Sequence, residues 1–189
     1  HILYYLIKNT NTNIYCLIRD KNNVDATDRI INKFKFYFNE DISPLLNNRV
    51  IVIKGNIINE NLNIPLNKYN KLGHKVDTVI HSAARVDHYG DSETFKNINI
   101  DGTNHVLEFC KKFNTKLNYI STISVSGTNI PDTKNIETFN ESSLYIGQNY
   151  EDNIYIKTKF EAEKILLEES QKGLPITIFR LGNITWRSK

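Results

Sequence analysis

The stretch Arg49-Val50-Ile51-Val52-Ile53-Lys54, which ends at Gly55, decides the expected fold. Its central residues are apolar and β-branched without alternation, which is typical of a strand buried on both faces. Parallel sheets covered by helices on both sides contain strands of this kind. The stretch therefore predicts an α/β fold rather than an antiparallel sheet with one face in water.

Strand-like and helix-like stretches alternate along the rest of the chain. Runs of β-branched and apolar residues predict strands, and apolar residues at helical spacing predict helices. The expected strands cover residues 13–19, 49–54, 76–81, 117–122 and 175–180. The expected helices are one that ends near residues 9–13 and those over 25–38, 92–113 and 153–171. This order predicts a Rossmann-like, doubly wound parallel sheet.

The composition is that of an ordinary globular domain. The 189 residues are 40% hydrophobic and 24% charged, with a formal net charge of +3. The lysines are scattered, so we expect no nucleic-acid partner. No apolar run approaches the roughly 20 residues that span a bilayer, so we expect no membrane partner. Cys16 and Cys110 form no Cys-x-x-Cys pair, which favours a cytoplasmic setting.

The glycine-rich turn of a dinucleotide-binding fold is not found in the sequence. Such a fold opens with a strand, this turn and a helix that holds the pyrophosphate. None of the eight glycines forms Gly-x-Gly-x-x-Gly. The strand that is then missing is the central one, between residues 13–19 and 76–81. We expect that the native protein extends upstream, that a neighbouring chain fills the position, or that the flanking strands close up, because exposed backbone groups need partners.

A phenol and an ammonium lie one helical turn apart in Tyr155-Ile156-Lys157-Thr158-Lys159. A phenol with a pKa of roughly 10 is a poor acid at neutral pH, and a nearby positive charge lowers that pKa. The earlier segment Leu117-Asn118-Tyr119-Ile120-Ser121-Thr122-Ile123-Ser124-Val125 adds hydroxyls at the end of an expected strand. Together these groups predict proton transfer to a carbonyl during hydride transfer.

The spacing alone is a weak signal, because Tyr4-Tyr5-Leu6-Ile7-Lys8 repeats it at the start of the chain. We interpret this copy as packing on an amphipathic helix, and the same explanation is open for Tyr155 and Lys159. The context separates the two copies. The hydroxyl-bearing strand and the long polar loop 128–150 precede Tyr155, and long loops in compact domains are often functional.

The motifs as a set resemble the thioester reductase domains of nonribosomal peptide and polyketide synthetases, within the extended short-chain dehydrogenase/reductases. Carboxylic acid reductases and fatty acyl-CoA reductases are related families. The matching segments, in chain order, are Ile14-Tyr15-Cys16-Leu17-Ile18-Arg19, Val76-Asp77-Thr78-Val79-Ile80-His81-Ser82-Ala83-Ala84, Asn99-Ile100-Asp101-Gly102-Thr103, Tyr119-Ile120-Ser121-Thr122-Ile123-Ser124-Val125, Tyr155-x-x-x-Lys159 and Phe179-Arg180-Leu181-Gly182-Asn183-Ile184.

The resemblance implies catalytic roles for Thr122, Tyr155 and Lys159. Tyr155 would be the proton donor, and Lys159 would lower its pKa and hold the nicotinamide ribose. Thr122 would hydrogen-bond the substrate oxygen, with Ser121 beside it. The implied activity is NADPH-dependent reductive release of an acyl or peptidyl thioester as an aldehyde, or as an alcohol after a second reduction. The implied partners are a phosphopantetheinylated carrier protein, which carries the thioester, and the upstream synthetase modules.

The resemblance also implies a set of cofactor-binding residues. Arg19 would pair with a 2′-phosphate, since a guanidinium is a fixed fork of donors, and this favours NADPH. Arg29 would assist it. Small residues after the third strand would let the cofactor approach, and Asn99 would brace the active-site helix. The complete expected set is Arg19, Arg29, Asn56, Ile57, Ala83, Ala84, Asn99, Ser121, Tyr155, Lys159, Asn183 and Ile184.

The chain departs from the family pattern at several places. Gly55-Asn56 stands where the family has Gly-Asp, and Arg180-Leu181-Gly182 stands where it has Arg-Pro-Gly. We expect residues 1–189 to be a partial, N-terminally truncated Rossmann domain without the substrate-binding subdomain that follows it in the family. We expect this fragment alone to be inactive, because the glycine-rich turn is absent.

Two other functions stay open. A nucleotide-sugar epimerase or dehydratase shares the Thr, Tyr and Lys residues, but it usually has an acid in place of Arg19. A non-catalytic Rossmann-like scaffold is the second alternative. Arg19 could simply close a strand at the surface, and Asn99 could be a satisfied polar residue between helices.

The remaining charged and histidine residues suggest no further site. Glu161 and Glu163 precede Lys164 in an ordinary charged face, so we expect both to be solvated. His81 and His88 have no third ligand at a suitable spacing, so we expect no metal site. We expect His81 to line or cap the cofactor cleft.

Overall fold

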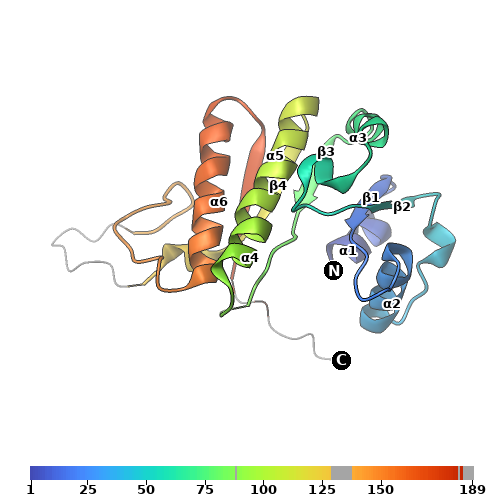
Figure 1. The fold of residues 1–189 in the computed structure, drawn as a ribbon, viewed down its shortest axis with the longest axis horizontal. Helices are drawn as coiled ribbons and strands as arrows, with labels where there is room; N and C mark the ends of the chain where they lie inside the picture. The colour runs from blue at the N-terminus through green and yellow to red at the C-terminus, as the bar shows by residue number, and fades with distance from the viewer. Residues whose placement is uncertain (88, 129–137, 183, 185–189) are drawn as a thin grey trace. The chain divides into compact units, whose positions relative to one another are not determined.

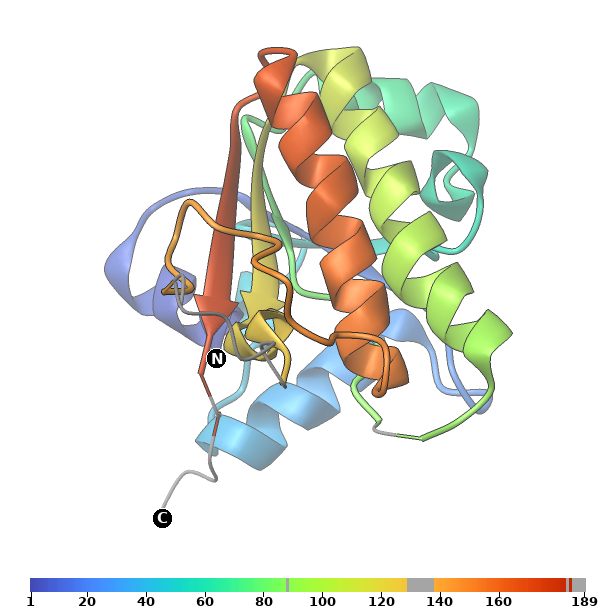
Figure 2. The ribbon, with the colours of Figure 1, turned by 90° about the vertical axis from the view of Figure 1, so that its left-hand side faces the viewer.

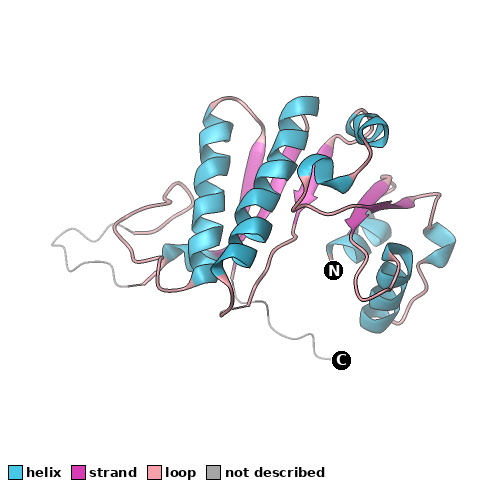
Figure 3. Cartoon of the chain, viewed as in Figure 1, coloured by secondary structure: helices cyan, strands magenta, loops and turns pink. Residues whose placement is uncertain are grey.

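The computed structural model describes residues 1–87, 89–128, 138–182 and 184. The chain divides into two compact units, His1–Lys68 and Tyr69–Lys189. Helix α3 (Leu66–Gly73) crosses the boundary between them. Figure 1 labels the elements and Figure 3 colours them by type.

The first unit is a two-stranded parallel sheet with helices packed on it. Its elements are α1 (Ile2–Asn9), β1 (Ile14–Ile18), α2 (Ala26–Phe38), the 3-10 turn η1 (Ser43–Leu45), β2 (Val50–Lys54) and the turn η2 (Glu60–Asn63). In the sheet Ile14 lies opposite Val50 and Ile18 opposite Lys54. Phe34, Ile42 and Val50 form the buried core. The unbroken apolar run that decided the expected fold is therefore a strand of a parallel sheet.

Helix α2 begins and ends where its flanking residues dictate. The Asp25 side chain accepts a hydrogen bond from Thr27 N at 2.8 Å, which caps the first turn. Asn39 ends the helix in the left-handed region at φ 53°, which asparagine tolerates better than most residues. On the inner side of α2, the Phe38 ring stacks on Tyr4 of α1 with 4.2 Å between ring centroids.

The second unit is a three-stranded parallel sheet in the order β3–β4–β5. Its elements after α3 are β3 (Thr78–His81), α4 (Ser92–Lys96), the π-helical turn η3 (Asn97–Asp101), α5 (Gly102–Phe113), β4 (Lys116–Thr122), the 3-10 turn η4 (Ile123–Ser126), α6 (Ile154–Gln171) and β5 (Ile176–Leu181). Figures 1 and 2 show α5 and α6 side by side along one face of this sheet.

The central strand β4 alternates between a fully buried face and a partly buried one. Leu117, Tyr119 and Ser121 are buried, and the residues between them are partly exposed. The buried face of β4 meets α6, whose buried residues include Phe160, Leu166 and, unexpectedly for a charged residue, Glu163. Apolar packing and polar contacts therefore share this one helix–sheet interface.

The expected α/β class with parallel strands is confirmed, and each expected strand is present within two residues of its predicted bounds. The predicted single helix over 92–113 is wrong in detail, because the turn η3 interrupts it. Each of the two strand orders is one that a doubly wound sheet contains. How the central position is filled stays a prediction. In the described part of the chain no helix has the length and apolar character that crossing a membrane requires.

Candidate active site

Tyr155 and Thr122 are brought together at the start of α6 and the end of β4. The Asn153 side chain caps α6 by accepting from the backbone N–H groups of Tyr155 at 2.9 Å and Ile156 at 3.2 Å. This cap fixes the first turn, which carries the phenol. The Tyr155 hydroxyl lies near the side chain of Thr122. Partial burial raises the pKa of Tyr155, and the Thr122 side chain opposes that rise.

Lys159 lies one turn further along α6 and is 2% exposed. Its Nζ donates to the Tyr119 hydroxyl and to the Ile120 carbonyl, both at 2.7 Å. It also lies 3.9 Å from the centroid of the Tyr119 ring, a distance suited to a cation–π contact. Burial lowers the pKa of Lys159 to about 7, and the charge of Glu163 opposes this shift. The ammonium is thus held inside the protein by β4.

The expectation that Lys159 lowers the pKa of Tyr155 is not what the structure shows. The pKa of Tyr155 is raised, and burial is the main cause. The physical reason is the direction of the lysine side chain, which reaches the strand and bonds Tyr119 and Ile120. A lysine with a pKa near 7 also carries only part of its charge at neutral pH.

Glu163 is the residue that the sequence interpretation placed wrongly. It was expected to be solvated, yet it is 0% exposed. Its Oε1 accepts from the Ser121 hydroxyl. Its Oε2 accepts from Arg180 Nε at 2.9 Å and from a terminal guanidinium nitrogen at 2.8 Å. Position 163 follows Lys159 by one helical turn, and this spacing was the available signal for a buried partner.

Asn99 joins the active-site helix to the loop after β3. It is 1% exposed, and its Nδ2 donates to Thr158 Oγ1 on α6 at 2.9 Å and to the Arg85 carbonyl at 3.0 Å. Its Oδ1 accepts from Arg85 N at 2.8 Å. Asn99 therefore contacts α6 as expected, and it also fixes the loop that carries Ala83, which is exposed, and Ala84, which is partly buried.

His81 does not line a cleft, because it is 4% exposed and packs inside the unit. Its Nε2 lies 3.1 Å from Thr103 Oγ1, and its ring centroid lies 5.5 Å from that of Tyr119. Burial lowers the pKa of His81 to about 3, with a smaller contribution from Lys159. No cluster of metal-ligating residues is found in the described parts of the chain. His88 lies outside the described residues.

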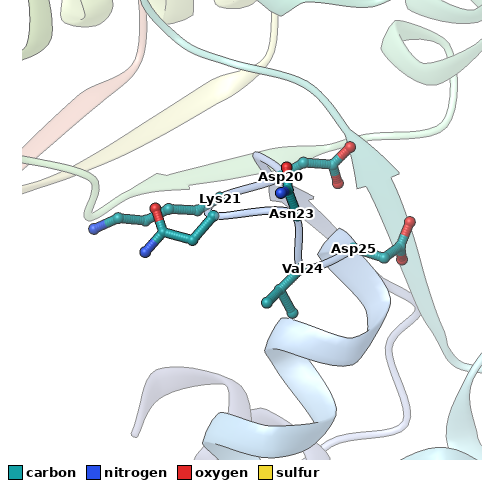
Figure 4. A pocket seen from close by; sticks show the side chains of 6 residues that line it. Asp20, Lys21, Asn23, Val24 and Asp25 are labelled. Atoms are coloured by element: carbon teal, nitrogen blue, oxygen red, sulfur yellow. The ribbon is translucent and has the colours of Figure 1, made fainter.

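Arg19 follows β1 in the first unit, and its side chain is exposed. The guanidinium of Arg29 donates to the Arg19 carbonyl. The neighbouring acid, Asp20, accepts from Ala26 N at 2.8 Å and lies 3.6 Å from Lys54 Nζ. The residues that directly follow Arg19 in the chain line an open pocket of about 480 Å³. Figure 4 shows residues that line it, and the complete lining is Asp20, Lys21, Asn22, Asn23, Val24 and Asp25.

The other expected cofactor residues follow the remaining strands. Asn56 comes after β2, and its side chain accepts from Ile58 N at 3.3 Å. Ile57 is partly buried. Ile184 follows β5 and is 83% exposed. Asn183 lies outside the described residues.

The sequence profile of an NAD-binding family, described as Male sterility protein, matches residues 1–189. The chain belongs to this family. Its fold also matches a thiolation–reductase di-domain from an archaeal non-ribosomal peptide synthetase, with a TM-score of 0.83 and 37% identity, over 97% of this chain and 38% of that one. The terminal R domain of the myxalamid PKS–NRPS pathway matches with a TM-score of 0.79 and 26% identity, over 97% of this chain and 46% of that one.

A curated relative gives the same result at the level of sequence. The chain is 30% identical over 187 residues to probable polyketide synthase 45 of Dictyostelium discoideum. The matched region covers 96% of this chain and 6% of that protein. The resemblance to thioester reductase domains is therefore confirmed. The chain spans less than half the length of each of these three matches.

Proposed function

We propose that this chain forms the cofactor-binding part of an NADPH-dependent reductase. The reductase releases an acyl or peptidyl thioester from a carrier protein as an aldehyde. The observation that carries the proposal is the contact of Tyr155 with Thr122, with Lys159 buried one turn away. Membership of the NAD-binding family supports a nicotinamide cofactor.

The residues present are suited to a dinucleotide. In a parallel α/β sheet, nucleotides bind beyond the carboxyl ends of the strands. An exposed cation, Arg19, follows β1, Asn56 follows β2, and the small residues Ala83 and Ala84 follow β3. In our proposal Asn99 holds the alanine loop in place, Ser121 and Lys159 lie on the nicotinamide side, and Arg29 fixes the Arg19 backbone. We also assign Ile57, Asn183 and Ile184 to the cofactor site.

The proposed chemistry is the reduction of a thioester carbonyl. The bound nicotinamide supplies a hydride to the carbonyl carbon. The hydroxyls of Tyr155 and Thr122 donate to the oxygen as negative charge develops on it, and Tyr155 passes on its proton. The ammonium of Lys159 favours this negative charge. The resulting hemithioacetal breaks its carbon–sulfur bond, which leaves an aldehyde and the free phosphopantetheine thiol. A second reduction of the aldehyde gives an alcohol.

The presence of Arg19 favours NADPH over NADH as the cofactor. It also favours the reductase over the epimerase alternative, which would hold NAD. An acid at the end of this strand would bind the ribose 2′-hydroxyl, whereas an arginine suits a 2′-phosphate. Asp20 is the nearest acid, but its carboxylate is already engaged by Ala26 N and faces Lys54. The guanidinium of Arg19 is therefore the group that we assign to the phosphate.

The test uses the full-length protein with an acyl-pantetheine thioester. We expect oxidation of NADPH that depends on the thioester, with an aldehyde or alcohol as the product. Tyr155→Phe is expected to lower kcat by about 10²–10⁴-fold, which is the usual contribution of a general acid. The matched control is Tyr4→Phe, in the other Tyr-x-x-x-Lys copy, which is expected to retain activity. Full turnover by Tyr155→Phe would refute the assigned role, and tightly bound NAD without net reduction would favour the epimerase.

A further inference from the structure

A buried ion pair connects three elements of the second unit. The Glu163 side chain on α6 is 0% exposed, and the Arg180 side chain on β5 is 12% exposed. Both carboxylate oxygens are used, because Oε1 accepts from Ser121 on β4 and Oε2 accepts two N–H groups of Arg180. Arg180 also donates to the Asn140 carbonyl at 3.0 Å. The pair therefore joins α6, β4, β5 and the segment before α6.

Stability alone is a poor explanation for such a pair. Moving two charges out of water is costly, and apolar residues of the same size often replace a buried pair at no loss. A fully bonded buried pair does, however, fix the geometry of the elements that it joins, because moving any of them leaves a charge without a partner.

In this protein the pair fixes the position of α6 along β4. Lys159 and Glu163 occupy successive turns of α6. Lys159 bonds the Tyr119 hydroxyl and the Ile120 carbonyl, and Glu163 bonds Ser121. The two side chains thus hold three consecutive residues of β4. The next residue is Thr122, whose side chain meets Tyr155.

We propose that the Glu163–Arg180 pair is a positioning element that holds α6 in register with the end of β4, so that Tyr155 meets Thr122 and Lys159 keeps its contacts with Tyr119 and Ile120. The pair touches neither of the two hydroxyls and acts through Ser121 and Lys159. This inference rests on the proposed function of the site.

The charges around Lys159 make the proposal testable. From β4 it faces Tyr119, from β3 His81, and from its own helix Glu163. Burial raises the pKa of Tyr119 and lowers that of His81 to about 3, so both are neutral at pH 7. Glu163 favours the ammonium form of Lys159, and Arg180 compensates Glu163.

Replacing Glu163 and replacing Arg180 should therefore shift the pKa of Lys159 in opposite directions. Glu163→Gln leaves the guanidinium uncompensated, and the alkaline limb of the kcat/KM profile should shift by about one unit to lower pH. Arg180→Met leaves the carboxylate uncompensated, and the limb should shift to higher pH. The double variant should return towards the wild-type profile. Glu161→Gln, on the same helix, is the matched control and should leave the limb in place.

The positioning itself is tested by Glu163→Asp, which keeps the charge but shortens the reach. We expect kcat to fall at least about tenfold, because small displacements of reacting groups are costly, while the alkaline limb stays where it is. Wild-type kcat in this variant would overturn the positioning role. Shifts of the limb in the same direction for Glu163→Gln and Arg180→Met would overturn the electrostatic part.

A readout that does not depend on turnover separates this inference from the proposed function. The ¹³C chemical shift of labelled Lys159, assigned with Lys159→Arg, reports its titration in the full-length protein. Opposite shifts in the two variants would support the charge coupling even if thioester reduction were absent, in which case only the proposed function fails. An active enzyme in which neither variant moves this titration would refute the inference and leave the function intact.

Discussion

Lys159 is the residue at which the proposed function and stability conflict most directly, because burying its ammonium group costs stability. Burial lowers its pKa from 10.5 to about 7 in the folded protein. Below pH 7 both the folded and the unfolded chain bind the proton, and the full cost of burying the charge is present. Between pH 7 and 10.5 the unfolded chain binds more protons, so the free energy of unfolding rises with pH over this window. Above 10.5 both states are neutral.

Lys159→Met removes this pH dependence. We expect the wild type to gain stability relative to Lys159→Met by about 3 kcal/mol between pH 7 and pH 10, from the size of the pKa shift. Urea unfolding of both proteins at the two pH values measures the difference. Lys164→Met, an exposed lysine of the same helix, should show no such change. A difference that is constant with pH would mean that the lysine is not buried as described.

At this scale the sequence indicated candidate residues for proton transfer and missed a buried partner. It grouped the Tyr155 phenol with the hydroxyls of residues 121–124, and the specific role of Thr122 came from the resemblance to thioester reductase domains. Glu163 was missed, since a glutamate beside Lys164 is ordinary on an exposed helical face. Only the fold reveals that β5 brings Arg180 to this helix. Arg180 lies outside α6, so the spacing of residues within the helix does not indicate the contact.

Among the elements, α6 matters most, because its first turn carries Tyr155. The Asn153 side chain caps this turn by accepting from the N–H groups of Tyr155 and Ile156. Asn153→Ala should cost about 1 kcal/mol of stability, the usual value for a lost cap, and should lower kcat because the phenol loses its fixed turn. Thermal unfolding and steady-state kinetics measure both effects. Asn153→Asp keeps a capping oxygen and should retain both properties, and equal losses in the two variants would contradict the capping role.

The elements themselves were largely predictable, and the exceptions have a physical cause. An unbroken apolar run identified β2, because buried parallel strands tolerate few polar residues. The predicted helix over 92–113 missed the turn η3, where the chain adopts π-helical bonding around the buried Asn99. A π-turn adds a residue to one helical turn without a distinct sequence signal. Such turns are frequent at functional sites, and this one aims Asn99 at Thr158 on α6.

For the molecule as a whole, cofactor binding should appear as a gain in stability. A ligand that binds only the folded state stabilises it by mass action, by about 2.7 kcal/mol at one hundred times its dissociation constant. If Arg19 binds a 2′-phosphate, NADPH should raise the melting temperature of the full-length protein more than NADH does at the same concentration. Arg19→Gln should remove this difference by weakening NADPH binding and leaving NADH binding unchanged.

Two controls make the measurement specific to this guanidinium. Lys33→Gln changes a cation of the same unit that lies against the rings of Phe36 and Tyr37 on α2, so it should leave the preference for NADPH intact. Raising the salt concentration should weaken the response to NADPH more than the response to NADH, because a contact between an exposed arginine and a phosphate is screened by ions. An equal response of the wild type to both nucleotides would contradict the assignment of Arg19, while stabilisation by either would still support the nicotinamide site that Tyr155 and Lys159 serve.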